Sequence, residues 1–227
     1  MESNSQEEFL TEPECYQWLK ENGLPVPPFA FCRNEEEACS MAQKIGFPVV
    51  LKIVSPDVIH KSDAGGVMIG LSEEESLKRA YCQVIENVKS RIPSAQIQGV
   101  LIQPFFQGGL EVIVGGLFDA QFGPAVMFGL GGIFVELLKD VTFRIAPFDE
   151  GEAMKMIMEV KGFPLLQGYR GRTPLDIRSL ASLLSKISRF MDENPQVLEL
   201  DLNPVFLFTK GYVISDARMK VRSSSKC

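Results

Sequence analysis

The sequence is poor in the residues that build structural metal sites and nucleic-acid surfaces. Its 227 residues contain one histidine and five cysteines, and no two cysteines form a C-x-x-C pair, which argues against a structural zinc site. An odd number of cysteines is typical of free thiols in a reducing compartment. The net charge of -6 argues against a broad basic surface for nucleic acid, but a small anionic ligand needs only a few local cations.

Long apolar runs and targeting segments are also missing. No apolar run approaches the roughly 20 residues that cross a bilayer, and the acidic start MESNSQEEF does not resemble a signal peptide. We therefore expect a cytoplasmic protein that binds neither membrane nor nucleic acid. With 45% apolar and 23% charged residues, the chain has the composition of a globular domain or of two small lobes.

Two common nucleotide-binding motifs are absent as well. The chain has no G-x-x-x-x-G-K-[ST] string, which excludes a P-loop NTPase, and no G-x-G-x-x-G string after a strand, which excludes a simple Rossmann domain. Strand and helix signals mix without a regular βαβ repeat, so the expected fold class is α+β.

Local signals predict the order of the elements. Helices are expected from the capping box Thr11–Glu14, from Asn34 to Gly46, from Ser72 to about Ser90, and from starts at Asp149 and at Thr173-Pro174. The predicted strands are 29–32, 47–54, 99–106, 110–117, 125–128, 141–146, 197–202, 205–208 and 212–215. Strands 99–106 and 110–117 are expected to pair as a hairpin around Gln107-Gly108-Gly109.

The first group of candidate functional residues lies on strand 47–54 and on the loop after it. Lys52 stands among apolar residues, where it either faces solvent from a half-buried strand or reaches a nucleotide phosphate. His60 lies on the loop that follows, and Gly65-Gly66 in that loop permits close backbone approach to phosphate. A lone histidine is usually structural, but imidazole is a competent phosphoryl nucleophile near neutral pH because its unperturbed pKa is about 6.5.

Two further strings contain residues suited to nucleotide chemistry. Phe128-Gly-Leu-Gly-Gly-Ile133 places Gly131 and Gly132 in a loop that is either a phosphate loop or a tight turn, and the roles of Glu136 and Arg144 beyond it are left open.

In the string from Glu199 to Pro204, the side chains of 199, 201 and 203 share one face of a strand. Asp201 and Asn203, with Asp216 further along, are oxygen donors suited to Mg²⁺, although a solvated strand face or a turn at Asn203-Pro204 explains the same letters.

Together these strings resemble the β subunits of ADP-forming acetyl-CoA (acyl-CoA) synthetases, in the ATP-grasp family. The resemblance extends from about Glu8 to Val221. Five strings carry it, in order: Gly46–Lys52, His60–Val67, Phe122–Pro124, Phe128–Ile133 and Glu199–Pro204.

The resemblance implies an ATP-grasp fold, in which two α+β lobes hold the nucleotide between them. The smaller lobe is expected at 25–98, and the larger at 1–24 plus 99–227. By the family pattern, the strand with Gln103, Phe105 and Phe106 is the adenine hinge, where many relatives have glutamate in place of Gln103. The resemblance further assigns Lys52 to nucleotide phosphates, Glu111 to ribose or phosphates, and Asp201, Asn203 and Asp216 to Mg²⁺.

The resemblance also implies a reaction and a partner. In this family a histidine of a CoA-binding α subunit takes a phosphoryl group from an acyl phosphate, and a β-subunit histidine passes it to ADP. His60 matches that second carrier, the loop Ser55–Gly66 is the expected moving segment, and an α2β2-type hetero-oligomer is expected. Two alternatives are a freestanding ATP-grasp carboxylate ligase and a non-enzymatic nucleotide sensor, and neither of them needs His60.

Overall fold

The computed structural model describes residues 7–132 and 139–222 of the chain. These residues form two compact units, and each is described by itself. The smaller unit comprises Thr11–Glu14 and Pro27–Gln107, and the larger comprises the described residues within Met1–Leu10, Cys15–Val26 and Gly108–Cys227. No helix of the described residues is long and apolar enough to cross a membrane.

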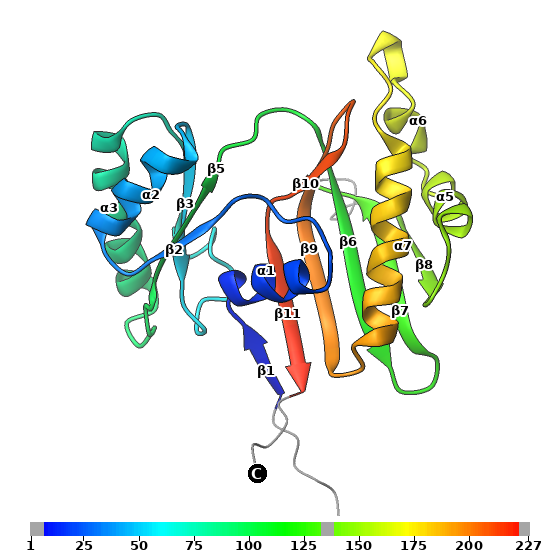
Figure 1. Cartoon of the computed structure of the whole chain (residues 1–227), viewed down its shortest axis with the longest axis horizontal. Helices are drawn as coiled ribbons and strands as arrows, with labels where there is room; N and C mark the ends of the chain where they lie inside the picture. The colour runs from blue at the N-terminus through cyan, green and yellow to red at the C-terminus, as the bar shows by residue number, and fades with distance from the viewer. Residues whose placement is uncertain (1–6, 133–138, 223–227) are drawn as a thin grey trace, which may run out of the picture. The chain divides into compact units, whose positions relative to one another are not determined.

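The smaller unit is an antiparallel sheet covered on one face by two helices (Figure 1). Four strands of the described residues pair in the order β2-β5-β3-β4. Their bounds are β2 (Ala30–Cys32), β3 (Val49–Val54), β4 (Val67–Leu71) and β5 (Gly99–Pro104), and the helices are α2 (Glu35–Ile45) and α3 (Glu74–Arg91).

The alternation of side chains along β3 explains how this sheet is built. Val49, Leu51 and Ile53 enter the apolar core shared with α2 and α3, so the side chains between them point to the opposite face. The predicted caps of α2 are confirmed: Asn34 accepts a hydrogen bond from the Glu37 amide at 2.8 Å, and Gly46 ends the helix with φ of 94°. Glycine adopts this positive φ without a Cβ clash.

The larger unit is a second antiparallel sheet with its helices on one face. Its described strands pair in the order β1-β11-β9-β6-β7-β8, with β10 on β9. Their bounds are β1 (Glu7–Leu10), β6 (Leu110–Asp119), β7 (Gly123–Leu130), β8 (Val141–Ile145), β9 (Val197–Leu207), β10 (Tyr212–Ile214) and β11 (Ala217–Arg222). The helical segments are α1 (Glu12–Glu21, with its first residues in the smaller unit), α5 (Glu150–Met158), α6 (Phe163–Leu166), the 3₁₀ turn η1 (Tyr169–Gly171) and α7 (Ile177–Glu193).

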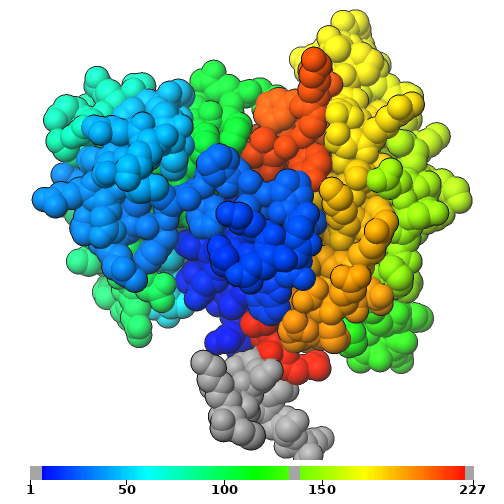
Figure 2. All heavy atoms as spheres, in the orientation of Figure 1, coloured from blue at the N-terminus to red at the C-terminus, as the bar shows by residue number. Residues whose placement is uncertain are grey.

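The helices α1, α5 and α7 leave the other face of this sheet open. α7 packs on β6 and β7, and α5 packs on β7 and β8. α1 lies on the same side as α7 (Figures 1 and 2), and the Asn194 amide at the end of α7 donates to Asn22 Oδ1 at 3.4 Å. Side chains such as Leu200 and Leu202 fill the core beneath the helices, while Glu199, Asp201 and Asn203 alternate with them on the open face.

The predicted hairpin between 99–106 and 110–117 is wrong. β5 pairs with β2 and β3, whereas β6 pairs with β7 and β9. Gln107-Gly108-Gly109 therefore connects the two units instead of closing a turn. The boundary of the smaller unit accordingly differs from the predicted 98, because Val100, Leu101 and Ile102 are fully buried in its sheet.

Other element boundaries also differ from the prediction. β9 runs without interruption through Asn203-Pro204, so neither the predicted turn nor the break between 197–202 and 205–208 is present. α7 begins after Asp176, whose carboxylate accepts from the Ser179 amide at 3.1 Å, and not at Thr173-Pro174. The strands β1, β4 and β11 were not predicted.

Candidate active site

His60 lies on the loop 55–66 that connects β3 to β4. The residue is exposed, but the loop around it is anchored, because Val58 and Ala64 are buried in the core of the smaller unit. The loop backbone closes on itself, since the Ala64 amide donates to the His60 carbonyl at 3.1 Å and the Gly66 amide to the Lys61 carbonyl at 2.7 Å. The structure thus presents an exposed imidazole on a fixed loop.

Side chains from α3 hold the far end of this loop. Asn87 Nδ2 donates to the Gly65 carbonyl at 3.0 Å, and the Arg91 guanidinium donates to the Asp63 carbonyl. Gly65 has a positive φ of 68°, and a Cβ on Gly66 would lie 2.6 Å from Ile53 Cγ2. Both glycines of the predicted phosphate loop are therefore required by the local packing.

A buried cluster of charges lies beneath the His60 loop. Lys52 Nζ is 2.6 Å from Glu12 Oε1, and Lys61 Nζ is 3.1 Å from Glu12 Oε2. Burial raises the pKa of Glu12, but the two ammonium groups outweigh it and hold the pKa of this carboxyl below its ordinary value. Glu12 is therefore an anion with two cations, which is the condition for keeping a charge inside a protein.

The structure excludes one of the two sequence interpretations of Lys52, and its contact with nucleotide phosphates stays a prediction. Lys52 is only 4% exposed, so the solvent-facing interpretation is wrong. Lys52 points away from the helices, and the register of β3 with β5 places Gln103 on the same face. Glu12 was not predicted as a functional residue. The capping box explains Thr11 and Glu14 but gives no signal for Glu12.

The predicted hinge residues follow directly on this face. Gln103 is fully buried, and Phe105 and Phe106 are half-buried where the chain leaves the smaller unit. The Phe105 amide donates to the Pro48 carbonyl at 2.9 Å, which fixes the end of β5 against the start of β3. The assignment of these residues to adenine stays a prediction.

In the larger unit, the second glycine string lies against Glu111. The Gly131 amide donates to the Glu111 carbonyl at 2.8 Å, and a Cβ on Gly131 would lie 2.9 Å from Glu111 Cβ. Gly132 follows with a positive φ of 60°. The structure thus brings together Glu111, Gly131 and Gly132, while Glu136 lies outside the described residues.

The three predicted metal ligands also meet on the larger unit. Asp201 and Asn203 share the open face of β9, and Asp201 pairs with Arg218 of β11. Because Leu202 pairs with Ala217, Asp216 lies opposite Asn203. Within the described ranges, no group of three His, Cys, Asp or Glu residues is placed to hold a metal by protein atoms alone. Two carboxylates and an amide nevertheless fit Mg²⁺, which is commonly held by one or two carboxylates plus nucleotide phosphates and water.

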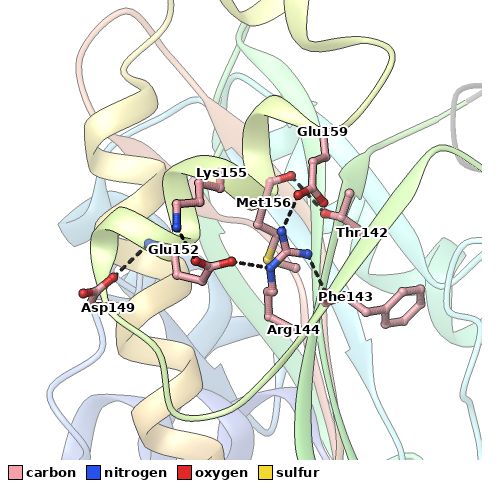
Figure 3. Close-up of polar contacts among 8 residues, drawn as sticks. All are labelled: Thr142, Phe143, Arg144, Asp149, Glu152, Lys155, Met156 and Glu159. Carbon is pink, nitrogen blue, oxygen red and sulfur yellow. Dashed lines mark hydrogen bonds and ion pairs between the residues drawn. The ribbon is translucent and has the colours of Figure 1, made fainter.

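Arg144 forms ion pairs with two glutamates and does not belong to the candidate site groups described above (Figure 3). From β8 its Nε donates to Glu152 Oε1 of α5 at 2.7 Å, and its other nitrogens reach Glu159 and the Phe143 carbonyl. Lys155 adds a 2.9 Å ion pair to Glu152. Arg144 therefore joins β8 to α5.

Comparison with known proteins gives a consistent family assignment. The ATP-grasp domain family matches residues 2–221. The chain is 49% identical over 210 residues to the β subunit of an ADP-forming acetate–CoA ligase I of Pyrococcus furiosus, covering 92% of this chain and 90% of that protein. It is 50% identical over 201 residues to an ADP-forming acetate–CoA ligase I of Archaeoglobus fulgidus, covering 88% of this chain but 29% of that longer protein.

A solved structure from Ca. Korarchaeum cryptofilum shows the same fold. It superposes with a TM-score of 0.83 at 46% identity, covering 95% of this chain and 93% of that chain. It is described as an acetyl-coenzyme A synthetase in complex with coenzyme A and Mg-AMPPCP, with its phosphohistidine segment pointing towards the nucleotide-binding site. The present chain therefore belongs to the ATP-grasp family, and within it to the β subunits of the ADP-forming acetate–CoA ligases.

Proposed function

We propose that this β subunit uses His60 as a phosphoryl carrier between a CoA-binding α subunit and ADP. The observation that carries the proposal is the placement of the chain's single histidine. His60 is exposed on an anchored loop, and the next residue, Lys61, belongs to a cluster in which two lysines share one carboxylate. That cluster places an ammonium group on the residue next to His60 and a second one beneath the loop, and the transfer of a phosphoryl group requires cations of this kind.

The proposed transfer has two balanced steps. A ring nitrogen of His60 attacks the phosphorus carried by a histidine of the α subunit, forming one P–N bond as the other breaks. A β-phosphate oxygen of ADP then attacks the same phosphorus, the bond to His60 breaks, and ATP is formed. Over the cycle, acyl-CoA, ADP and phosphate give the acid, ATP and CoA.

Residues in each unit have a proposed role toward the nucleotide. Lys52 would neutralise its phosphates, Gln103 and the backbone at Phe105 and Phe106 would bind the adenine, and Glu111 would lie near the ribose or phosphates. The amides around Gly65, Gly66, Gly131 and Gly132 would approach the phosphates. Mg²⁺ held by Asp201, Asn203 and Asp216 would supply charge neutralisation at the transferring phosphoryl group.

The partner would be an α subunit in an α2β2-type assembly. The chain spans 29% of the Archaeoglobus relative, so the rest of that protein corresponds to sequence that this chain does not contain. The His60 loop is a poor candidate for the moving segment expected from the sequence, because Val58 and Ala64 are buried and Asn87 and Arg91 bind its backbone. We assign the travelling segment to the partner instead, and a cytoplasmic location stays a prediction.

The test is turnover in a reconstituted complex. This chain is mixed with a separately expressed α subunit of such a ligase, and ATP formation from acetyl-CoA, ADP and phosphate is followed. The wild-type mixture should be active, and the purified chain alone should be inactive. His60→Ala and His60→Asn should be inactive in the mixture, because neither side chain can carry phosphate, while their affinity for ADP should change little.

Two results would contradict the proposal in different ways. Turnover of His60→Ala within about tenfold of wild type would remove the carrier role and favour the freestanding ligase. Nucleotide binding without turnover under any pairing with an α subunit would favour the nucleotide sensor.

A further inference from the structure

The two lysines that share Glu12 are not held equally. Lys52 lies in the middle of β3, which is paired on both sides, and its side chain is 5% exposed. Lys61 lies on the loop next to His60, and its side chain is 15% exposed. The cation on the strand is therefore held by the sheet, whereas the cation on the loop is more exposed and is adjacent to His60 in the sequence.

The contacts of the carboxylate show the same asymmetry. Lys52 Nζ makes a 2.6 Å hydrogen bond with Glu12 Oε1. Lys61 Nζ lies 3.1 Å from Oε2, and this buried oxygen accepts no hydrogen bond from the described residues. Since a short charge-assisted hydrogen bond is stronger than a longer contact, Glu12 holds Lys61 at 3.1 Å less firmly than Lys52 at 2.6 Å.

We infer that Lys61 is an exchangeable contact for the phosphoryl group on His60, and that Glu12 is its counter-charge in the resting state. This inference rests on the proposed carrier role of His60. When the phosphoryl group is on His60, the Lys61 ammonium leaves Glu12 Oε2 and binds a phosphoryl oxygen. Glu12 then keeps Lys52 as its partner, so no buried charge is left uncompensated.

Charge explains why the exchange is favourable. A phosphoryl group carries between about one and a half and two negative charges near neutral pH, and Glu12 carries one that it already shares with Lys52. In the resting state Lys52 and Lys61 together hold the pKa of Glu12 low against the effect of burial, and after the exchange Lys52 remains the cation paired with Glu12. Glu12 is thus a positioning residue, and Lys61 is a catalytic residue that contacts the transferred group.

The test compares rates of His60 phosphorylation by labelled ATP and Mg²⁺ in the full chain. Lys61→Gln should slow labelling by about tenfold or more, because a charged contact to the phosphoryl group is lost, and should leave nucleotide affinity unchanged. Lys61→Arg should recover most of the rate. Lys78→Gln, which removes an exposed lysine paired with Glu74 on α3, is the matched control and should label like wild type.

A variant of Glu12 distinguishes two roles for Lys61: contact with the phosphoryl group, or holding the His60 loop through Glu12. Glu12→Gln removes the tie but keeps Lys61, so it should label within about threefold of wild type if Lys61 acts by contact. An equal loss of labelling rate in Glu12→Gln and Lys61→Gln would show that Lys61 only holds the loop, and would overturn the inference.

The remaining outcomes are also decisive. If Glu12→Gln fails to fold, the pair Lys61→Arg and Lys61→Gln decides alone, because equal losses in both contradict a charge contact. A wild-type chain that takes no label on His60 overturns the carrier role itself, whereas a labelled wild type with an equally fast Lys61→Gln overturns the role of Lys61 alone.

Discussion

At the scale of single residues, the chain separates its acidic and basic functional groups by sheet. The smaller unit contains the cations Lys52 and Lys61 with His60, and the larger contains the oxygen donors Asp201, Asn203 and Asp216. Each set is positioned by strand register: Lys52 by β3 against β5, and Asp201 by β9 against β11. In the proposed function, the cations neutralise phosphate and the oxygen donors hold Mg²⁺, the two kinds of group that phosphoryl transfer uses.

The oxygen donors lead to a metal-dependence prediction. Asp201→Asn and Asp216→Asn should each raise the Mg²⁺ concentration for half-maximal turnover by about tenfold, because an amide replaces a hard anionic ligand. The measurement is a Mg²⁺ titration of the reconstituted complex. Asp192→Asn, an exposed carboxylate on α7, should titrate like wild type. Unchanged titrations for both Asp201→Asn and Asp216→Asn would identify this strand face as merely solvated.

At the scale of elements, Arg144 links β8 to α5. The hydrogen bond from Arg144, followed by that from Lys155, lowers the pKa of Glu152. A carboxyl whose pKa is lowered on folding stabilises the folded state above its unfolded pKa, and this contribution is lost as the pH falls through the folded pKa. The ion pair between Arg144 and Glu152 should therefore stabilise the folded state at neutral pH and lose this effect in acid.

Arg144→Met tests this ion pair, since methionine keeps an apolar stem without the charge. It should lower the free energy of unfolding at pH 7 by a small amount, because the ion pairs are partly exposed and screened by solvent. The difference from wild type, measured by urea unfolding, should shrink below the ordinary glutamate pKa of 4.5. Lys186→Met, at an exposed position of α7, is the control. A difference that is constant from pH 7 to acid would contradict the electrostatic explanation.

Elements with strong local signals could be predicted, and those defined by distant pairing could not. The β-branched run of β3 and the caps of α2 identify themselves within a few residues. The pairing of β1 with β11 joins the two ends of the described chain, so no local pattern indicates it. The false hairpin at Gln107–Gly109 arose because glycines that connect two units look like glycines in a tight turn.

The candidate site was predictable to the same extent. His60, Lys52 and the two glycine strings stand out by residue type, and β-strand alternation placed Asp201 and Asn203 on one face. Glu12 did not stand out, because its function depends on lysines 40 and 49 positions away. The direction of Lys52 was also open, since every residue of β3 is buried and burial on both faces removes the alternation that would show it.

At the scale of the whole molecule, the chain supplies one part of a divided reaction. Membership of the acetate–CoA ligase β subunits, with relatives in which the corresponding sequence is part of a longer chain, is consistent with a nucleotide-handling part that works with a CoA-handling part. His60 is the proposed point of transfer between them. The proposed transfer and the exchange of Lys61 both depend on that residue carrying phosphate.

The most direct test is phosphorylation of the purified chain. The chain is incubated with γ-labelled ATP and Mg²⁺ and analysed for protein-bound phosphate, with His60→Ala as the matched variant. We expect the wild-type chain to take a label that is lost in acid and stable in base, as a phosphohistidine is. The label should map to His60, and His60→Ala should take none. An unlabelled wild type, or an equal label on His60→Ala, would contradict the central claim.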